Sequence, residues 1–278
     1  MTESTSLQAV MRHCLDAYAY RHRLSARQRQ VCHHVLSCRT AALGGLQLDC
    51  DRCEDRPVLY YACRDRHCPR CGRKATTEWL ERQQAGLLPV TYHHLVFTVP
   101  HKLNGWIDVH SRALYALLFE AVWATLSAFG QRRLKGQMGM VAVLHTWGQN
   151  LSRHVHLHCL VPAGALGTDG WRRAKGEYLF PVRALSRKLR GAFVSRLRQR
   201  IDAGGLPRLS DGGHIKTVLD QLMGTEWVVY TKPCLHYTGS VVEYLARYTH
   251  RIALSDHRLS GLDEQGRVRL DIKDYRDG

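Results

Sequence analysis

The chain has 278 residues, of which 45% are hydrophobic and 23% are charged, a composition typical of one or two folded domains and not of a disordered protein. No apolar run approaches the roughly 20 residues that a membrane helix needs, and the first residues lack the apolar core of a secretory signal, so we expect a cytoplasmic protein with no membrane partner. Its 40 Lys and Arg against 24 Asp and Glu give a formal charge of +16. This charge attracts polyanions and predicts nucleic acid as the partner, the alternative being a merely solvated basic surface.

The first part of the chain, up to residue 88, has the pattern of a small basic module. Between residues 7 and 36, apolar residues spaced among Arg, His and Gln predict two short basic helices with a break near residues 23–30. The segment 38–72 has too little apolar material for a hydrophobic core, so it needs another organiser. A further helix is predicted over residues 74–89, where Gly86 and Pro89 end it.

Cysteines are the expected organiser of this module. Eight of the ten cysteines precede residue 72, and without a secretory signal, metal-bound thiolates fit better than disulfides. Two C-x-x-C pairs, "CDRC" and "CPRC", are separated by fourteen residues, and each brings two sulfurs to one side of a tight turn. The residues predicted to hold a tetrahedral Zn²⁺ are Cys50, Cys53, Cys68 and Cys71. The residues left for a second zinc, or for ligand exchange with the first, are Cys38, Cys63 and His67, with His33 or His34.

After Pro89 the sequence alternates between strand and helix patterns. The predicted strands cover residues 91–100, 139–148, 154–162, 225–233 and 266–275. The predicted helices cover residues 103–130, 182–202 and 239–252. A glycine-rich turn is expected over residues 164–178. Because a short connection joins the second and third strands, we expect an α+β fold with a central antiparallel sheet flanked by helices.

Three histidines alternate in the segment "RHVHLHCLVPAG". Residues two apart in a strand point the same way, so His154, His156 and His158 share one face and the apolar residues between them pack on the other. Imidazoles on one face of a strand form a natural site for a divalent metal. Ordinary core or surface histidines, or the centre of a zinc hydrolase, are the alternatives.

Two tyrosines near the end of the chain have the spacing of one helical face. Tyr244 and Tyr248 are four residues apart, and an arginine, Arg247 or Arg251, follows each of them by three. A phenol with a pKa of about 10 is on the order of 0.1% ionised at pH 7, so a tyrosine nucleophile needs an electrophile polarised by a metal and cations. Arginines would stabilise the charge that builds on a phosphate. Alternatively, the two rings pack in an apolar stripe.

Several segments together resemble a known enzyme family. "HTWGQNLSRHVHLHCLVPAG" and "YLARYTHRIALSDHRL" are similar to the metal and nucleophile motifs of the HUH single-strand endonucleases, specifically the two-tyrosine rolling-circle transposases of bacterial insertion sequences. "CRTAALGG" and "CRDRHCPRCG" resemble the zinc-binding domain that precedes their catalytic domain, and "HLVFTVP" resembles their first strand motif. The resemblance implies a zinc-binding DNA-recognition domain over residues 1–88 and an HUH endonuclease domain over residues 89–278.

The resemblance also implies roles for individual residues. His156 and His158 match the pair that holds the catalytic Mg²⁺ or Mn²⁺, and His154 matches a histidine that commonly precedes the pair. The residues that it implies in catalysis are Tyr244 and Tyr248 as nucleophiles, with Arg247 and Arg251 beside them.

The third metal ligand is expected to be Gln149, with Glu243 and His250 as the alternatives. Gln149 lies seven residues before His156 and can return to the same site across paired strands. The chain departs from the family at Val155, where relatives have proline, and in the segment "KPCLHYTGSVVEYL". It also ends at "DIKDYRDG", where relatives continue, which predicts a fragment or a copy shortened at its C-terminus.

The function that the resemblance implies is rolling-circle DNA transposition. Such an enzyme nicks and rejoins single-stranded or hairpin DNA at the ends of its element through a 5′-phosphotyrosine, and in a bacterium it would be associated with the nucleoid. The zinc module and the basic helices around residues 21–29 would read the DNA end. One alternative is a catalytically decayed, zinc-dependent DNA-binding protein that represses its own element, and the zinc hydrolase is the other.

Overall fold

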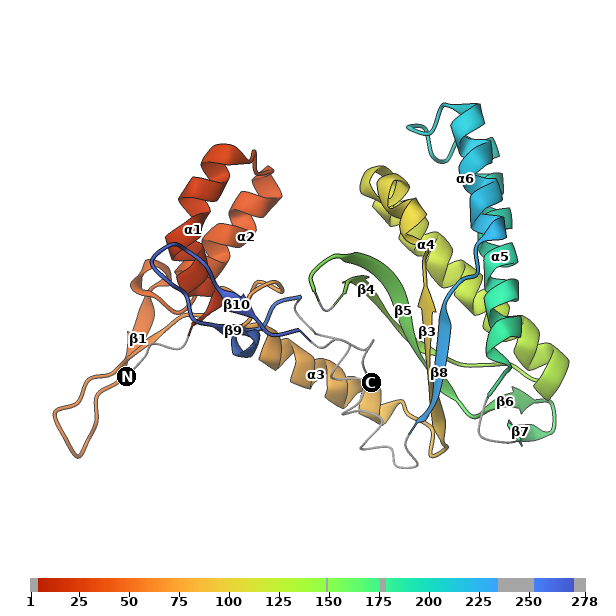
Figure 1. The fold of residues 1–278 in the computed structure, drawn as a ribbon. Coiled ribbons are helices and arrows are strands. Elements are labelled where there is room, and N and C mark those ends of the chain that lie inside the picture. The colour runs from red at the N-terminus through yellow and green to blue at the C-terminus, as the bar shows by residue number, and fades with distance from the viewer. Residues whose placement is uncertain (1–4, 149, 176–178, 235–252, 273–278) are drawn as a thin grey trace. The chain divides into compact units, whose positions relative to one another are not determined.

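The computed structural model describes residues 5–148, 150–175, 179–234 and 253–272 (Figure 1). The chain divides into two compact units. The first consists of the described residues up to Arg82, together with residues 150–151 and 253–272. The second consists of the described residues between 83 and 234, without residues 150–151. The sequence places residues 253–272 in the second domain, whereas their contacts group them with the first unit.

The first unit begins with two helices, α1 (Leu7–Arg21) and α2 (Ala26–Ser37), where the sequence predicts them. A serine hydroxyl caps the start of each helix, and Ser25 forms a capping box with Gln28 at the start of α2. The buried side-chain amide of Gln8 lies 2.9–3.0 Å from the carbonyl oxygens of Val35, Leu36 and Cys38 and donates to them. This amide therefore fixes the direction in which the chain leaves α2.

A short arm follows α2 and leads into the next helix. After a 3-10 turn, η1 (Ala41–Leu43), strands β1 (Gly45–Gln47) and β2 (Val58–Tyr60) pair antiparallel and enclose the exposed residues 48–57. The next helix, α3 (Gly72–Ala85), is the one that the sequence predicts.

The described C-terminal residues return to the first unit. They form a 3-10 turn, η4 (Asp256–Arg258), and two short paired strands, β9 (Leu259–Ser260) and β10 (Arg269–Leu270). The backbone N–H of Leu7 donates to the carboxylate of Asp256 over 2.8 Å, which ties this segment to α1. The prediction of a strand beginning at residue 266 is wrong in its start, because the carboxylate of Asp263 accepts from the backbone N–H of Arg267 and uses those residues in a turn.

The second unit is built on a sheet of four strands in the order β4-β5-β3-β8, and every neighbouring pair is antiparallel. The bounds of these strands are Tyr92–Thr98 for β3, Val141–Trp147 for β4, Arg153–Pro162 for β5 and Val229–Cys234 for β8. The sheet confirms the predicted α+β class with a central antiparallel sheet. Strand β5 is internal, since it pairs with β4 on one side and with β3 on the other.

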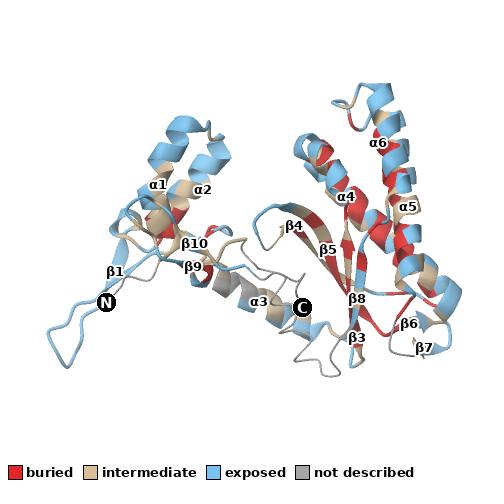
Figure 2. Ribbon diagram, in the orientation of Figure 1, coloured by how far each residue is buried: buried red, intermediate tan, exposed pale blue. Residues whose placement is uncertain are grey.

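Three helices form a layer on one side of this sheet, of which the first two lie against the strands and the third packs against the second (Figure 1). They are α4 (Asn104–Phe129), α5 (Val182–Asp202) and α6 (Gly212–Gly224), with a 3-10 turn η2 (His101–Leu103) before α4 and a π-type turn η3 (Gly130–Leu134) after it. The facing residues of strands and helices form one hydrophobic core, seen as the buried positions in Figure 2. The stretch His101–Leu134 is long and apolar enough to cross a membrane by length and composition alone, but its buried residues belong to this core, as in a core helix.

A small hairpin follows β5, within the stretch that the sequence predicts as a glycine-rich turn. It consists of β6 (Gly164–Gly167) and β7 (Gly170–Arg173), paired antiparallel. A Cβ at Gly164 would lie 2.6 Å from the carbonyl oxygen of Arg172 and would also meet the indole ring of Trp171. Only glycine therefore lets the two strands of the hairpin approach this closely.

Candidate metal centres

The first candidate centre is a cluster of histidines on the face of the sheet that points away from α4 and α5. In β5, Val155, Leu157 and Cys159 belong to the hydrophobic core, so the alternating histidines point to the opposite face. In β4, His145 is the register partner of His156. The ring nitrogens of His145, His156 and His158 that could bind a metal lie within 4.8 Å of one another.

Hydrogen bonds orient these imidazoles. Nδ1 of His156 lies 3.0 Å from the carbonyl oxygen of His154 and donates to it, which leaves Nε2 of His156 as the metal-binding atom. Nδ1 of His158 lies 2.8 Å from Nε2 of His94, on the neighbouring strand β3. His94 therefore fixes the orientation of the His158 ring.

Burial keeps two histidines of this face, His94 and His156, in the neutral form. The pKa of His156 is lowered to about 4, first by burial and then by the charge of the neighbouring His145. Burial also lowers the pKa of His94 to about 4, with the positive charge of Lys232 as the next cause. Lys232 is the register partner of His94 in β8, so the centre has a cation beside it. Neutral imidazoles with a nearby cation suit a site for a metal ion and an anionic substrate.

His154, the first of the three alternating histidines, has a different partner. Its Nδ1 lies 2.9 Å from Nε2 of His101 in η2, and it is not among the three histidines whose nitrogens converge. His145 takes the third position instead. Sequence patterns did not single out His145 or His94, because only the pairing of β4 and β3 with β5 brings them to this place.

The remaining residues predicted for the catalytic site lie outside the described part of the chain. They are Gln149, Glu243, Tyr244, Arg247, Tyr248, His250 and Arg251.

The second candidate centre is a cluster of four thiols in the first unit. The sulfur atoms of Cys38, Cys63, Cys68 and Cys71 all lie within 4.8 Å of one another. Two of the sulfur pairs, Cys38–Cys71 and Cys63–Cys71, are 3.4 and 3.6 Å apart. A tetrahedral zinc site with Zn–S bonds of about 2.3 Å places its sulfurs ~3.8 Å apart, so the cluster suits Zn²⁺.

Local structure brings these four cysteines together from three segments. Cys38 ends α2, and Cys68 and Cys71 form the turn that leads into α3, where the N–H of Cys71 donates to the carbonyl of Cys68 over 3.1 Å. Cys63 closely follows β2, and the N–H of Arg39 donates to the carbonyl of Tyr61, which draws this segment towards the end of α2.

The carboxylate of Asp65 supports the turn between Cys63 and Cys68. It accepts hydrogen bonds from the backbone N–H of His67 at 2.9 Å and from the ring of His34 at 2.8 Å. Burial alone would raise the pKa of Asp65, but these two hydrogen bonds outweigh it and hold the pKa below its usual value.

The grouping of cysteines differs from the predicted one. Cys50 and Cys53 are exposed in the arm between β1 and β2 and do not join Cys68 and Cys71. The antiparallel pairing of β1 with β2 carries the arm away from the cluster, so Cys38 and Cys63 take the two remaining positions.

The histidines considered for the second zinc also lie outside the thiol cluster. His67 and His33 are exposed, and His34 is engaged with Asp65.

Comparison with known proteins gives two family matches and two relatives. A family described as "Putative transposase" matches residues 139–278, and a "Transposase zinc-binding domain" matches residues 10–99. The chain is 43% identical over 274 residues to "Putative transposase y4qJ" of Sinorhizobium fredii, covering 95% of this chain and 69% of the relative. It is 28% identical over 254 residues to "Transposase for insertion sequence element IS801" of Pseudomonas savastanoi pv. phaseolicola, covering 87% of this chain and 60% of the relative. No solved structure matches.

The thiol cluster predicts which cysteines hold zinc. We expect Cys38→Ser to lose most of the bound zinc and to unfold at a lower temperature, because three thiolates no longer close a tetrahedral site. Cys53→Ser, the matched control in the exposed arm, should keep the zinc content and melting temperature of the wild type. Zinc content by atomic absorption and thermal unfolding check both variants. Equal zinc loss in the two variants would contradict the grouping.

The buried histidines predict how stability depends on pH. In the folded protein His94 and His156 have a pKa of about 4, while an unfolded histidine has a pKa of about 6.5, so the unfolded chain binds more protons between these values. With respect to these histidines, the free energy of unfolding should therefore have its full value above pH 6.5 and should fall as the pH decreases towards 4. Urea unfolding without added divalent ions measures this. In the double variant His94→Gln and His156→Gln the decrease should be smaller, and an unchanged decrease would refute the assignment.

Proposed function

The chain belongs to the IS91-type transposases of bacterial insertion sequences, and on this premise we propose that it nicks and rejoins single-stranded DNA at the ends of its element through a metal-assisted 5′-phosphotyrosine intermediate. The observation that supports this most is the convergence of His145, His156 and His158 on one face of the sheet. A transposase acts on DNA, and the chain's charge of +16 suits that partner. Its cysteine cluster and zinc-binding domain support a structural Zn²⁺.

The histidine cluster is the proposed site of the catalytic metal. His156 and His158 supply two ligands, and His145 competes with the expected Gln149 for the third position. We favour His145, because its ring nitrogen already lies with the other two. Mg²⁺ prefers oxygen ligands, whereas imidazoles suit transition ions better, so of the two expected ions Mn²⁺ fits three histidines better.

In the proposed reaction, a phosphoryl group of the DNA backbone is transferred from the 3′ oxygen to a tyrosine. The bound metal would supply a Lewis acid that polarises the phosphoryl oxygens. The phenol oxygen of Tyr244 or Tyr248 attacks the phosphorus, and the bond from phosphorus to the 3′ oxygen breaks. The phenolic proton leaves the tyrosine and the departing 3′ oxygen gains a proton, so the products are a 5′-phosphotyrosine and a free 3′-hydroxyl. No nucleotide hydrolysis is needed, because the bond energy is kept in the phosphotyrosine.

Cations would stabilise the charge that develops on the phosphate. Arg247 and Arg251 have this role in the proposal, and Lys232 adds a charge from β8, beside His94. A second tyrosine would allow a second strand to be cut or joined while the first remains attached.

Recognition of the DNA end would fall to the first unit. Four exposed arginines lie at the end of α1, in the connection after it and in the first half of α2, namely Arg21, Arg23, Arg27 and Arg29. They lie in the unit whose fold depends on the thiol cluster, so loss of zinc should weaken DNA binding together with folding.

A covalent adduct assay tests the proposal. Wild type incubated with a labelled single-stranded element end and Mn²⁺ should form a protein–DNA band that resists denaturation. The double variant Tyr244→Phe and Tyr248→Phe should form none, while its dissociation constant for the DNA should stay within about twofold of the wild-type value, because a lost hydroxyl removes the nucleophile and little surface. Tyr115→Phe, on helix α4 and packed against the core on the other side of the sheet, is the matched control. Adducts in the double variant would refute the nucleophiles, and DNA binding without adducts in wild type would favour the repressor.

The third metal ligand can be identified with paired alanine variants. His145→Ala should weaken Mn²⁺ binding by at least about tenfold, because the site of three imidazoles loses one ligand, whereas Gln149→Ala should change it little. Electron paramagnetic resonance of Mn²⁺ measures this binding without interference from the zinc. The reverse order of effects would assign the third position to Gln149.

A further inference from the structure

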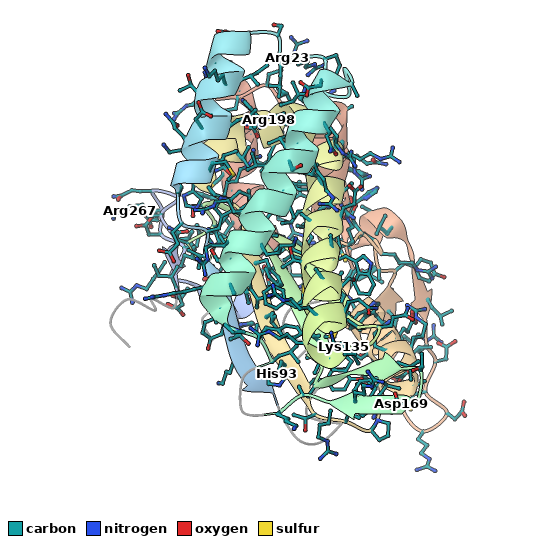
Figure 3. All side chains as sticks on the ribbon, turned by 90° about the vertical axis from the view of Figure 1, so that its right-hand side faces the viewer. Arg23, His93, Lys135, Asp169, Arg198 and Arg267 are labelled. Carbon is teal, nitrogen blue, oxygen red and sulfur yellow. The ribbon has the colours of Figure 1, made fainter. Side chains whose placement is uncertain are left out.

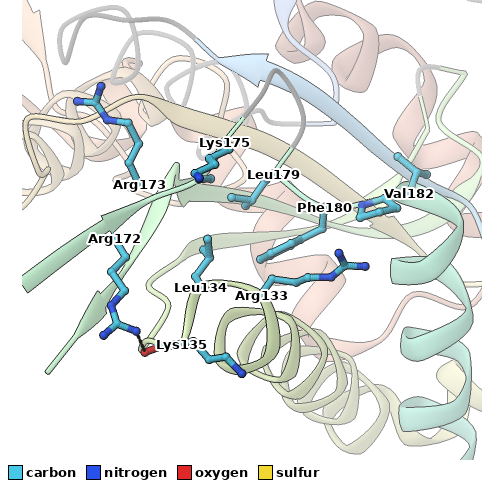
Figure 4. Close-up of a pocket in the computed structure, with 11 residues that line it drawn as sticks. Arg133, Leu134, Lys135, Arg172, Arg173, Lys175, Leu179, Phe180 and Val182 are labelled. Atoms are coloured by element: carbon cyan, nitrogen blue, oxygen red, sulfur yellow. Dashed lines mark hydrogen bonds between the residues drawn. The ribbon is translucent and has the colours of Figure 1, made fainter. Parts of the chain in front are cut away.

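A basic pocket lies in the second unit, at the end of the helical layer where α4 finishes and α5 begins (Figure 4). Its volume is about 950 Å³. The residues that line this basic pocket are Arg133, Leu134, Lys135, Arg172, Arg173, Ala174, Lys175, Leu179, Phe180, Pro181 and Val182. They come from η3, from β7 and from the segment that leads into α5. Among the described residues, the lining contains five cations and no acidic residue.

The cations of the pocket are available for an anionic ligand, with one exception. Arg172 is engaged, because its guanidinium donates to the carboxylate of Asp169 and to the carbonyl oxygen of Lys135. The others are Arg133, Lys135, Arg173 and Lys175, all exposed and without an ion-pair partner among the described residues. Cations held around one concave surface create a stronger positive potential than the same charges dispersed.

The fold holds the rims of the pocket in place. Gln137 and Leu166 form a β-bridge with two hydrogen bonds of 2.8 and 2.9 Å, which joins the chain after η3 to β6. A Cβ at Gly136 would lie 2.7 Å from the carbonyl oxygen of Leu166, so this close approach requires glycine. The hydrogen bond from Arg172 to Lys135 closes the same connection from β7. Hydrogen bonds therefore hold together the backbone segments that carry these cations.

The floor of the pocket is apolar. Leu179 and Phe180 are buried, and the ring of Phe180 packs against Phe129 with 5.1 Å between ring centroids. A rim of cations over an apolar floor suits a ligand that combines phosphates with less polar groups, as a nucleotide chain does. A free inorganic phosphate would use only the rim.

The pocket shares no described residue with the histidine cluster. Strand β5 carries the histidines in its first half, and β6 begins at Gly164, six residues after His158. At about 3.3 Å per residue, the chain advances ~20 Å between them. Figure 3 shows Lys135 and Asp169 at one end of the helical layer and Arg198 towards the other, so the basic pocket lies at a defined end of this layer.

We propose that the basic pocket binds the phosphate backbone of single-stranded DNA at a distance from the cleaved phosphate. The inference rests on the proposed function, since it assigns a second contact to the strand that the histidine site would cut. The rise of about 3.4 Å per nucleotide in a stacked strand makes ~20 Å equal to at most roughly six nucleotides, because an unstacked single strand is more extended. The pocket holds the strand and takes no part in the chemical step.

The test compares two triple variants on DNA of two lengths. The pocket variant is Arg133→Ala, Arg173→Ala and Lys175→Ala, which leaves the structural Arg172 intact. The matched control is Arg112→Ala, Arg208→Ala and Lys216→Ala, which removes three exposed cations from the region of the second unit around the start of α4 and of α6. The probes are a short labelled element end and the same DNA extended by twelve thymidines on its 5′ or 3′ side. Dissociation constants are measured by fluorescence anisotropy across a range of NaCl concentrations.

In wild type, an extension on one side should tighten binding. The pocket variant should lose about tenfold in affinity for that extended probe, and its salt dependence, as log Kd against log salt, should become shallower by about 2, because about three phosphate contacts are lost. It should bind the short probe as wild type does. The control should bind every probe as wild type does. The proposal is overturned if neither extension tightens binding, or if the pocket variant matches wild type on the extended probe or loses affinity equally on both.

The same variants separate this inference from the proposed function. On saturating short DNA the pocket variant should form covalent adducts at the wild-type rate, because the tyrosines and histidines are intact. Failure of wild type to form adducts would remove the cleavage mechanism but leave the binding comparison valid. If adducts form normally but the pocket variant binds the extended DNA as wild type does, only the proposal for the pocket is refuted. Inorganic phosphate at matched ionic strength should compete little with the extended probe, and strong competition would show a site for the free ion instead.

Discussion

The register of the antiparallel strands is the constraint on which the second unit depends. In β5, the residues at 155, 157 and 159 fill the core and the histidines between them point to the other face. A shift of one residue would exchange these sets, burying imidazoles under α4 and exposing the apolar chains. The same alternation holds in β3, where His93 points to the core side and His94 to the metal side. The hydrophobic core and the histidine cluster are therefore two consequences of one pairing.

The two units use different means to order their chains. The second unit buries a continuous set of apolar residues from its strands and helices. In the described part of the first unit, Val35 lies with Cys38 and Cys68 in a small apolar cluster. Metal binding can provide the folding energy that such a small core lacks. The amide of Gln8 connects this cluster to α1, because it donates to the carbonyl of Cys38 at the end of α2.

Local patterns in the sequence predict the elements well but predict their partners less well. The α+β class, the helices α1, α2, α4 and α5, and the common face of His156 and His158 follow from periodicity. The involvement of His145 and His94 depends on which strands pair. The alternation of residues within one strand does not predict which other strand lies beside it. The C-x-x-C spacing likewise favoured Cys50 and Cys53, whereas the chain path brings Cys38 and Cys63 to the cluster. The return of residues 253–272 to the first unit depends on contacts with α1 that are distant in sequence.

We expect the exposed thiols of the arm to be oxidised more readily than the clustered thiols. The pKa of the Cys50 thiol is lowered, first by the backbone N–H of Arg52 and then by the thiol of Cys53, so a larger share is thiolate at neutral pH. Thiolates that coordinate a metal are protected, while this neighbouring pair is open to solvent. Mild oxidants should therefore join Cys50 to Cys53 before they damage the four clustered sulfurs. Oxidation of the arm would then consume the oxidant before it reaches the four sulfurs proposed to hold the zinc.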